Sequence, residues 1–557
     1  MQSNKLKEIK EILSYIYPED YNKIYNSVKE KINLINTERK NFYKLSNNDS
    51  ILITYADNLY RENEKGLKTL NDFSEKYLKD SVNTIHILPF FPYSSDDGFS
   101  VIDYKKVAEG NGDWNDIETL SEKYRLMFDA VINHVSKKSS WFREYLKGNS
   151  IYEKYFLELE NTDGFNNVVR PRTHSLLTEF KTSDGYKKIW TTFSEDQIDL
   201  NYKNPDVLSE IIDILLFYAE KGAKLIRLDA IGFLWKEKNT SCIHLEKTHK
   251  IIKLIRKIFE LTYSDVLIVT ETNVPHEDNI SYFGNGNDEA HMIYNFTLPP
   301  LLLYTYFKHD SEIFSEWLKS ISSPSENTAY FNFLASHDGI GLRPLEGIID
   351  EKNIEDLTED IKKHGGLVSY KNNPNGTKSP YELNINLFSA FVCSDTELSI
   401  RKFISAYAIA CFIPGIPGIY IHSLLGSKNY YKGVENTGQN RSINREKLDY
   451  IKLSRELENK ESTRYKIFSE MKKLLKIRKN NKEFDPFTPM EVIKSGKDII
   501  CFERDKSIRF ILNISEKIKK IDIDGDFSYH ENNIKIKDYV ILKPYEFILL
   551  KRDLKTV

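Results

Sequence analysis

Residues 222–233 read GAKLIRLDAIGF, a short apolar run that carries an arginine and an aspartate near its C-terminal end. The nearly continuous apolar character is typical of a strand covered on both faces, as in a parallel sheet flanked by helices. Arg227 and Asp229 are two residues apart, so in a strand they point to the same face. Opposite charges on a buried strand are costly unless they pair. This stretch alone fits a structural ion pair and a catalytic carboxylate held by an arginine equally well.

Seven further stretches share this apolar character, and amphipathic helical stretches such as 208–221 and 247–261 lie between several of them. The eight strands that we expect are 51–55, 84–88, 125–132, 224–228, 266–270, 292–295, 330–334 and 418–421. Such βα alternation predicts a parallel sheet. Eight units predict an α/β fold with a closed (β/α)8 barrel, whose active site lies where the strands end.

Changes in this rhythm divide the chain. Two long insertions are expected to cover the catalytic end of the barrel, and alternating stretches at 492–503, 507–514 and 539–550 predict an antiparallel β domain at the end. The expected parts are an N-terminal helical extension (1–48), the first part of the barrel (49–134), an inserted B subdomain (135–204), the middle part (205–339), an inserted loop subdomain (340–390), the last part (391–482) and the C-terminal β domain (483–557).

Composition excludes several classes of protein. The 557 residues include 79 basic and 82 acidic ones, so a formal net charge of -3 gives no general attraction to nucleic acid or to an anionic membrane. The four cysteines form no CxxC pair and no zinc spacing, which fits a reducing cytoplasm. The N-terminus has no apolar signal core, and no run is long and apolar enough to span a bilayer. We therefore expect a cytoplasmic monomer or homodimer.

Polar residues gather at the ends of the predicted strands. Residues 129–134 read DAVINH, Asp229 and Glu271 each follow a strand, and residues 336–338 read SHD. Taken singly, each has a plain structural interpretation, such as a helix cap or a hydrogen-bonded core histidine. Residues distant in sequence meet at the strand ends of a barrel, however, and their presence at successive ends favours a catalytic site.

These four stretches resemble the signature regions of the α-amylase superfamily, glycoside hydrolase family 13, and the resemblance covers essentially the whole chain. It implies a retaining mechanism through a covalent glucosyl-enzyme. It further implies that Asp229 is the nucleophile, Glu271 the general acid/base, and Asp338 the third carboxylate, which steadies the distorted sugar ring. The residue types suit this chemistry, because glycosidic cleavage needs one protonated carboxyl and one ionised carboxylate.

The resemblance also assigns the neighbours of the carboxylates. It implies that Arg227 orients Asp229, and an arginine two residues before a nucleophile lowers the pKa of that carboxyl. It implies that His134 and His337 hydrogen-bond the hydroxyls of glucose.

A narrower resemblance links the stretch PFFPYSSDDGF (89–99) to the sucrose phosphorylase subfamily. It implies that Asp96 and Phe99 bind the non-reducing glucose, and that Arg445 pairs with Asp96 across the sugar. A pocket closed in this way suits an enzyme acting on a small glucoside. From the residues alone, a surface turn at Asp96 and a solvated arginine at Arg445 remain equally open.

Phosphorolysis requires a site for inorganic phosphate, the co-substrate of that subfamily. The stretch RPR (170–172) resembles its phosphate-binding loop and implies a role for Arg172, whose guanidinium suits a phosphate. Tyr381 resembles the tyrosine of a second loop that acts with phosphate. We expect no other cofactor and no metal, since Asn133 resembles a calcium ligand of amylases but has no evident partner cluster.

Two departures from sucrose phosphorylases lie near the expected leaving group. This chain has Phe233 in place of a tyrosine and Asn273 in place of a histidine. The stretches 235–246 and 271–277 look more like the glucosylglycerate phosphorylase branch, so we expect glycerate as the acceptor. Fructose (sucrose phosphorylase), fructose 6-phosphate (sucrose 6'-phosphate phosphorylase) and glycerol remain alternatives. A non-phosphorolytic glucosidase or transglycosylase would use the same carboxylates, whereas a non-catalytic member of the superfamily would be expected to lack one.

Overall fold

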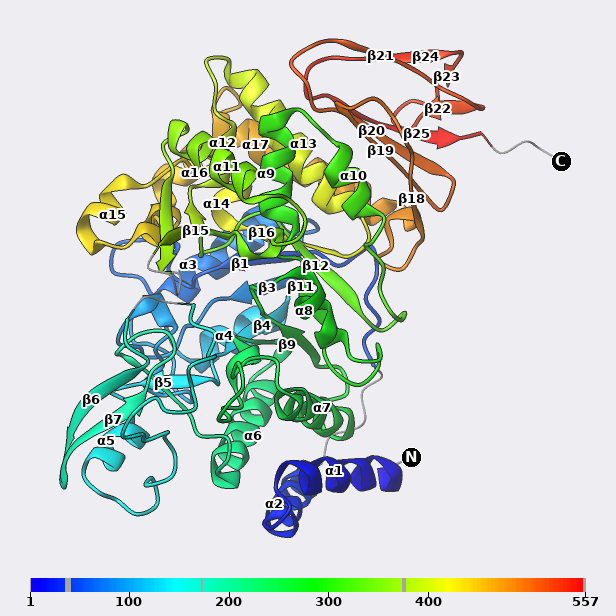
Figure 1. The fold of residues 1–557 in the computed structure, drawn as a ribbon. Helices are drawn as coiled ribbons and strands as arrows, with labels where there is room; N and C mark the ends of the chain where they lie inside the picture. The colour runs from blue at the N-terminus through cyan, green and yellow to red at the C-terminus, as the bar shows by residue number, and fades with distance from the viewer. Residues whose placement is uncertain (1, 36–41, 172–173, 373–376, 554–557) are drawn as a thin grey trace.

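The barrel is confirmed by the computed structural model, which describes residues 2–35, 42–171, 174–372 and 377–553. Eight parallel strands close in the order β1-β16-β12-β11-β10-β9-β4-β3 (Figure 1). They are β1 (Ile51–Thr54), β3 (Thr84–Ile87), β4 (Arg125–Ala130), β9 (Ala223–Leu228), β10 (Leu267–Thr270), β11 (Met292–Tyr294), β12 (Ala329–Phe333) and β16 (Ile416–Tyr420). Each overlaps one predicted stretch, with ends that differ by two residues or fewer.

Helices surround this barrel. The longer ones are α3 (Gly66–Phe73), α4 (Trp114–Ser121), α6 (Pro205–Glu220), α7 (Glu246–Leu261), α9 (Leu298–Lys308), α10 (Glu312–Leu318), α13 (Thr396–Phe412), α16 (Tyr450–Glu458) and α17 (Thr463–Asn480). The shorter ones near the site are η2 (Asp96–Gly98), η3 (Ile231–Phe233), α8 (His276–Ile280), η5 (Arg343–Leu345), α12 (Leu387–Phe391), α14 (Ile421–Leu424), α15 (Tyr431–Thr437) and η6 (Asn440–Asn444). In the described part of the chain, none of the helices has the length and apolarity needed to cross a membrane.

The register of the strands sets the level of the catalytic rim. Leu228, the last residue of β9, lies beside Ala130 on β4 and beside Thr270 on β10. The next residues along β9 and β10, Asp229 and Glu271, therefore leave the barrel at the same level. Helix α6 leads into β9 with Pro205 in its first turn and an N-cap formed by Asn204, whose side chain accepts a hydrogen bond from the backbone of Asp206.

The N-terminal region holds α1 (Gln2–Ile16) and α2 (Tyr21–Leu34), which pack against the outer surfaces of α7 and α6 (Figure 1). The hydroxyl of Tyr17 donates a 2.7 Å hydrogen bond to the carbonyl of Tyr202, so the end of α1 is fixed near the end of the first insertion. These helices therefore pack on the outside of the barrel.

The first insertion is built from antiparallel pairs and one short helix. Strand β5 (His134–Ser136) pairs with β8 (Gln197–Asp199), and β6 (Leu177–Thr182) pairs with β7 (Gly185–Trp190). Helix α5 (Ser140–Leu146) packs on β6. The pairing of β5 with β8 brings the two ends of the insertion together beside the barrel.

The second insertion has more regular structure than its Asn- and Gly-rich sequence predicts. Strands β13 (Ile340–Gly341), β15 (Lys378–Asn384) and β14 (Leu367–Asn372) form an antiparallel sheet in that order, accompanied by helix α11 (Glu351–Lys363). Its helical signal is the set of apolar residues on one face, Ile354, Leu357 and Ile361. Residues 373–376 lie outside the described part of the chain.

The C-terminal β domain is antiparallel, as expected, but two predicted stretches each split into two strands. Its strands are β18 (Met490–Val492), β19 (Ile499–Arg504), β20 (Ile508–Asn513), β21 (Lys519–Asp522), β22 (Phe527–Tyr529), β23 (Lys535–Ile536), β24 (Tyr539–Leu542) and β25 (Phe547–Arg552). The stretch 492–503 contains a turn between β18 and β19, and 539–550 breaks at Tyr545, which has a φ of 55°. A left-handed residue ends an extended strand.

Candidate active site

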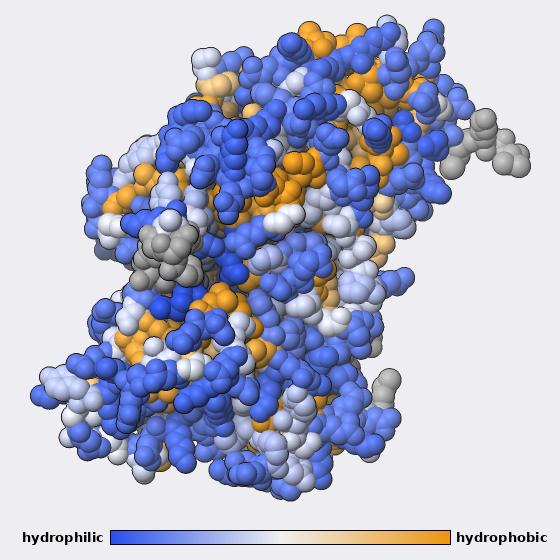
Figure 2. Space-filling model, viewed as in Figure 1, coloured by the Kyte–Doolittle hydropathy of each residue, from blue (hydrophilic) through white to orange (hydrophobic). Residues whose placement is uncertain are grey.

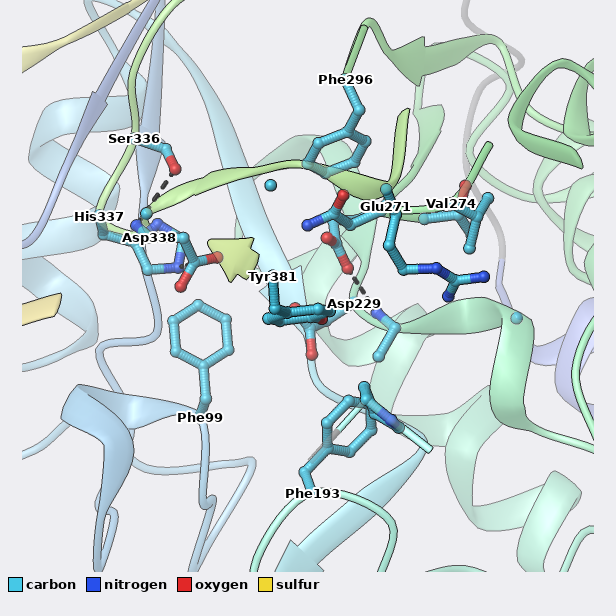
Figure 3. Close-up of a pocket in the computed structure, with 18 of the residues that line it drawn as sticks. Phe99, Phe193, Asp229, Glu271, Val274, Phe296, Ser336, His337, Asp338 and Tyr381 are labelled. Carbon is cyan, nitrogen blue, oxygen red and sulfur yellow. Dashed lines mark hydrogen bonds and ion pairs between the residues drawn. The ribbon is translucent and has the colours of Figure 1, made fainter. Parts of the chain in front are cut away.

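A pocket with an open volume of about 990 Å³ lies at the C-terminal ends of the barrel strands. Four carboxylates line it: Asp96, Asp229, Glu271 and Asp338. Figure 3 shows Asp229, Glu271, Asp338 and Tyr381 around the same space. The other predicted site residues that line it are Phe99, His134, Phe233, Asn273 and His337. The molecular face drawn in Figure 2 is mostly hydrophilic, with apolar residues exposed around the hollow in its middle.

Arg227 holds Asp229 from beneath the pocket floor. Its guanidinium is 2% exposed and does not line the pocket. Nη1 donates to Asp229 Oδ1 at 2.8 Å and also bonds Asp129. Asp129 in turn contacts Nε2 of His86 at 2.6 Å. Among the described residues, Arg227 alone bonds the carboxylate of Asp229, and the buried Asp129 and His86 hold this guanidinium in place.

Glu271 lies beside this pair on the next strand. Its Oε2 accepts a 2.9 Å hydrogen bond from the backbone N–H of Ala230 and lies 4.0 Å from Nη2 of Arg227. Burial raises the pKa of Glu271, and the charges of Asp338 and Asp129 add to this effect.

Asp229 and Glu271 are coupled titrating groups. Burial raises the pKa of Asp229 and the charge of Glu271 raises it further, whereas Arg227 lowers it. The guanidinium is 2.8 Å from Asp229 but 4.0 Å from Glu271, so it favours a negative charge on Asp229. When the pair holds a single proton, this geometry places the negative charge on Asp229 and the proton on Glu271.

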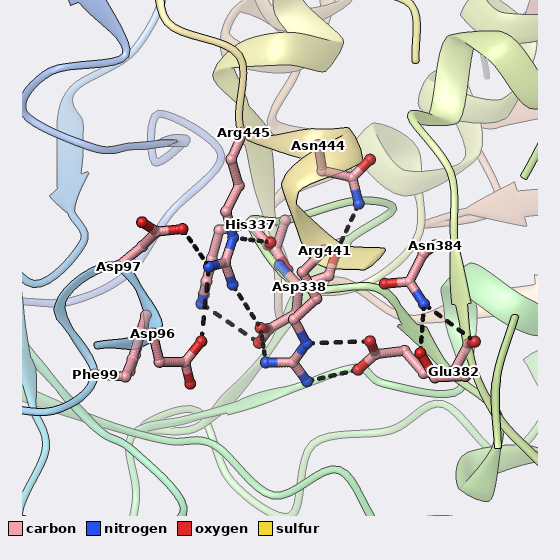
Figure 4. A network of polar contacts seen from close by, with 12 residues as sticks. Asp96, Asp97, Phe99, His337, Asp338, Glu382, Asn384, Arg441, Asn444 and Arg445 are labelled. Atoms are coloured by element: carbon pink, nitrogen blue, oxygen red, sulfur yellow. Dashed lines mark hydrogen bonds and ion pairs between the residues drawn. The ribbon is translucent and has the colours of Figure 1, made fainter. Parts of the chain in front are cut away.

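Asp338 lies in a separate network of arginines, drawn in Figure 4. Arg441 Nη1 contacts Asp338 Oδ1 at 2.5 Å, and the same guanidinium donates two hydrogen bonds, of 3.1 and 2.6 Å, to the buried carboxylate of Glu382. Burial acts to raise the pKa of Asp338, but Arg441 and Arg445 hold it well below its usual range. Asp338 is therefore ionised throughout the neutral range.

The predicted pairing of Arg445 with Asp96 is present as a longer contact. Arg445 Nη1 lies 3.7 Å from Asp96 Oδ1, and it makes its shorter bond, 2.6 Å, to Asp97. Both aspartates have left-handed backbones, with φ of 53° and 46°. Non-glycine residues adopt this conformation where surrounding contacts enforce it, and such strain gathers at functional sites. The turn around Asp96 is thus held by Arg445 in a strained form.

Two neutral histidines, His134 and His337, lie in the same wall of the pocket as Asp96 and Phe99. His337 stacks on Phe99 with ring centroids 4.7 Å apart and an interplanar angle of 4°. Burial lowers the pKa of His337 to about 3, and burial also lowers the pKa of His134. Nε2 of His134 lies 2.9 Å from the carbonyl of Phe99 and 3.2 Å from the amide of Gln197. Uncharged imidazoles on this wall can exchange hydrogen bonds with hydroxyl groups.

Three more of the predicted residues, Phe233, Asn273 and Tyr381, line the same pocket. Phe233 packs edge-on against Phe193 with centroids 5.3 Å apart, and Asn273 lies against Gly341. Tyr381 reaches the pocket from β15. Arg172 lies outside the described residues, although its neighbour Pro171 lines the pocket.

Asn133 contacts a lysine. Lys236 Nζ donates to Asn133 Oδ1 at 3.0 Å and lies 2.7 Å from Asp199 Oδ2, and all three side chains are buried. Asn133, which resembles a calcium ligand of amylases, thus contacts the ammonium group of Lys236. Within the described ranges, no group of three or more His, Cys, Asp or Glu side chains is arranged to hold a metal ion.

Sequence reasoning missed several residues of the pocket. Arg441 lies four residues before Arg445 in the stretch NRSINR, and Glu382 follows Tyr381, so both were adjacent to predicted residues. Arg343, in the pocket wall, follows the SHD motif by five residues. A second arginine beside a predicted one was the available signal for Arg441; nothing comparable marked Glu382 or Arg343.

Comparison with known proteins gives the same family as the motifs. The family described as "Alpha amylase, catalytic domain" matches residues 54–342. The chain is 44% identical over 528 residues to a glucosylglycerate phosphorylase of Escherichia coli, covering 93% of this chain and 94% of that protein. It is 48% identical to one of Spirochaeta thermophila, covering 83% of this chain and 78% of the other.

A solved structure extends the comparison to the fold. The crystal structure of sucrose 6F-phosphate phosphorylase from Thermoanaerobacter thermosaccharolyticum has a TM-score of 0.75 and 26% identity, and covers 89% of this chain and 98% of that one. The chain therefore belongs to the α-amylase family, glycoside hydrolase family 13, in the branch that contains these phosphorylases.

Proposed function

We propose that this chain is a retaining α-glucoside phosphorylase that reversibly converts glucosylglycerate and inorganic phosphate into α-D-glucose 1-phosphate and glycerate. The observation that carries the proposal is the pair of carboxyls, Asp229 and Glu271, that line one pocket, with Arg227 bonded to Asp229. Relatives at 44% and 48% identity are glucosylglycerate phosphorylases, whereas a sucrose phosphorylase of Streptococcus mutans is 30% identical, which favours glycerate over fructose.

In the first step, Asp229 attacks the anomeric carbon of the glucosyl unit. The bond between that carbon and the glycosidic oxygen breaks, and Glu271 gives its proton to the oxygen, so glycerate leaves with a neutral hydroxyl group and an unchanged carboxylate. The glucosyl unit is then an ester of Asp229 with inverted configuration. Asp338, kept ionised by Arg441, stabilises the positive charge that develops on the ring.

In the second step, an oxygen of hydrogen phosphate attacks the same carbon from the face that the acceptor has left. Asp229 departs as a carboxylate, and Glu271 takes the proton of the attacking phosphate. The second inversion restores the α configuration and returns both carboxyls to their starting state. We propose that Arg172 and Tyr381 bind the phosphate.

The proposed reaction uses inorganic phosphate as a co-substrate and no cofactor. The glucose-binding roles go to Asp96, Phe99, His134, His337 and Arg445, while Phe233 and Asn273 contact the acceptor. A cytoplasmic location and a monomeric or homodimeric state stay predictions from the sequence.

A phosphate-dependence assay with an acceptor screen tests the proposal. With glucosylglycerate, we expect α-D-glucose 1-phosphate when phosphate is present and little free glucose without it. In the synthetic direction, glycerate should be preferred to fructose, fructose 6-phosphate and glycerol. Glucose release that is independent of phosphate would make the protein a glucosidase, and preference for fructose or its phosphate would make it a sucrose or sucrose 6'-phosphate phosphorylase.

A variant of Arg172 tests whether this residue binds the phosphate. Arg172→Ala should weaken the use of phosphate more than it weakens the cleavage of the glucoside, measured as hydrolysis of the same substrate without phosphate. Equal loss of both activities would remove Arg172 from the phosphate site.

A further inference from the structure

One cation in the pocket wall has almost no partner. Arg343 lies on η5 and lines the pocket, with 17% of its side chain exposed. Within the described residues, its recorded ion pair is with Glu346, whose Oε1 is 4.0 Å from Nε, beyond hydrogen-bond distance. Glu346 is 45% exposed and lies closer to Lys371, at 3.3 Å. An exposed, shared carboxylate at this distance neutralises a guanidinium poorly.

The other arginine that lines the pocket differs in this respect. Arg441 contacts both Asp338 and Glu382 at 2.5 to 3.1 Å, so each of its three nitrogens already has a carboxylate partner. Among the lining residues that the structure describes, Arg343 is the guanidinium left to receive an anion. A fork of free N–H donors suits a carboxylate bound through two parallel hydrogen bonds.

The chain places Arg343 on the leaving-group side of the carboxylate pair. Gly341, two residues before it, packs so closely on Asn273 that a Cβ atom at this glycine would lie 2.2 Å from Nδ2 of the amide. Asn273 is itself two residues after Glu271 and lines the pocket. Glu271 hands its proton to the leaving oxygen, so the acceptor must lie on this wall.

Polar atoms without partners surround the same wall. Oδ1 of Asn273 and Nε2 of His244 are buried and have no hydrogen-bond partner within the described structure. Burial lowers the pKa of His244 to about 4, so this imidazole is uncharged at neutral pH. Buried polar groups left unsatisfied are costly, and a bound hydroxyl group at Asn273 would relieve that cost.

We propose that Arg343 binds the carboxylate of a small hydroxy acid acceptor and thereby selects an acidic acceptor over a neutral polyol, with Asn273 receiving an acceptor hydroxyl. This inference rests on the proposed function and deepens it, because it identifies the group that recognises the acid. The proposed role differs from that of the phosphate-binding residues. The effect of replacing Arg343 should depend on the charge of the acceptor and should be independent of the glucosyl donor.

The test compares two acceptors with one donor. The wild type and the Arg343→Gln and Arg343→Lys variants receive α-D-glucose 1-phosphate with either glycerate or glycerol, so any effect on phosphate cancels in the ratio of the two activities. For Arg343→Gln, we expect kcat/KM for glycerate to fall on the order of 10- to 100-fold, mainly through KM, with little change for glycerol. Arg343→Lys should recover part of the loss. Lys371→Gln is the matched control, which removes a nearby positive charge outside the pocket and should leave the ratio unchanged.

The outcomes separate this inference from the proposed function. If the wild type uses glycerate and the ratio is the same in Arg343→Gln, the inference is wrong and the proposed function stands. Parallel loss with both acceptors, together with a raised KM for phosphate, would assign Arg343 to phosphate and also overturn it. A wild type that does not use glycerate refutes the proposed function itself. Activity with glycerol confirms that each variant is folded.

Discussion

The two ends of the pocket are built on opposite principles. One end, which we propose binds glucose and call the glucose end, is a connected network in which charged groups contact each other at 2.5 to 3.7 Å. It is formed by Asp96, Phe99, His134, His337, Asp338, Arg441 and Arg445. The other end, which we propose binds the acceptor and call the acceptor end, has an apolar ring, a poorly paired guanidinium and, within the described residues, an amide oxygen without a partner. It is formed by Phe233, Asn273, Val274 and Arg343.

This difference shows where recognition is fixed and where it can vary. A network that satisfies its own charges is preorganised for one ligand, because changing any member leaves another buried charge without a partner. Loosely paired groups instead acquire their partners from the ligand. We therefore expect changes at the glucose end to affect all acceptors equally, and changes at the acceptor end to alter the choice among them.

The largest expected effect comes from the nucleophile, which both ends share. Asp229→Asn keeps the shape of the side chain but removes the attacking charge, so transfer to every acceptor should fall on the order of 10⁴-fold or more. Steady-state rates of phosphorolysis measure this loss. The bond from Arg227 to Asp129 remains in the variant, and thermal unfolding serves as the control for folding. A loss smaller than about 100-fold would show that another group forms the ester.

Glu271 should give the next largest effect and a change in pH dependence. Burial raises the pKa of Glu271, so its acid form persists to higher pH than that of a free glutamate; activity is present below that pKa and is lost as pH rises through it. Glu271→Ala should lower kcat by about 10²- to 10⁴-fold and abolish this alkaline limb. With α-glucosyl fluoride as donor, whose fluoride leaves without a proton, the loss in formation of the ester should be much smaller. An unchanged pH profile would contradict the assignment.

A change at the glucose end tests whether its effect is the same for all acceptors. Glu382 lies 2% exposed beneath Arg441 and takes two of its hydrogen bonds. Glu382→Gln replaces one carboxylate oxygen by an NH2 group, which cannot accept a hydrogen bond from Arg441. The guanidinium of Arg441 then loses part of the support that orients it towards Asp338. We expect kcat/KM to fall about 10- to 100-fold with glycerate and with glycerol alike. A changed ratio between the two acceptors would connect this network to the acceptor end.

The sequence predicted the barrel because its signals are local. Strands such as β9 are largely apolar, and the carboxylates follow them directly, so position along the chain specifies position on the rim. The same rule located Asp229, Glu271 and Asp338. The rule did not identify Lys236, because its partners, Asn133 and Asp199, lie far away in the chain and contact it only in the folded state.

The loops were harder to predict, since their residues act through contacts that spacing does not encode. Arg445 was expected beside Asp96, but the turn at residues 96–98 places the adjacent Asp97 closer to the guanidinium. Arg343 carries no motif at all. Its significance comes from the absence of a strong partner, a property of the folded pocket that no sequence pattern reports.

The smallest expected effect is at Phe233, and it isolates the acceptor end most cleanly. The ring lines the pocket edge-on to Phe193, so Phe233→Tyr adds one hydroxyl group without removing a contact. A new polar group here needs a partner from the acceptor, which favours a polyhydroxylated ligand such as fructose over the smaller glycerate. We expect the fructose-to-glycerate ratio of kcat/KM to rise by roughly 10-fold or less, with hydrolysis of α-D-glucose 1-phosphate unchanged.

Phe233→Leu is the matched control, because it alters packing without adding a hydroxyl group and should not raise this ratio. If Phe233→Tyr slows hydrolysis as much as transfer, the residue acts on the glucosyl unit, and the division of the pocket into two ends does not hold at this position.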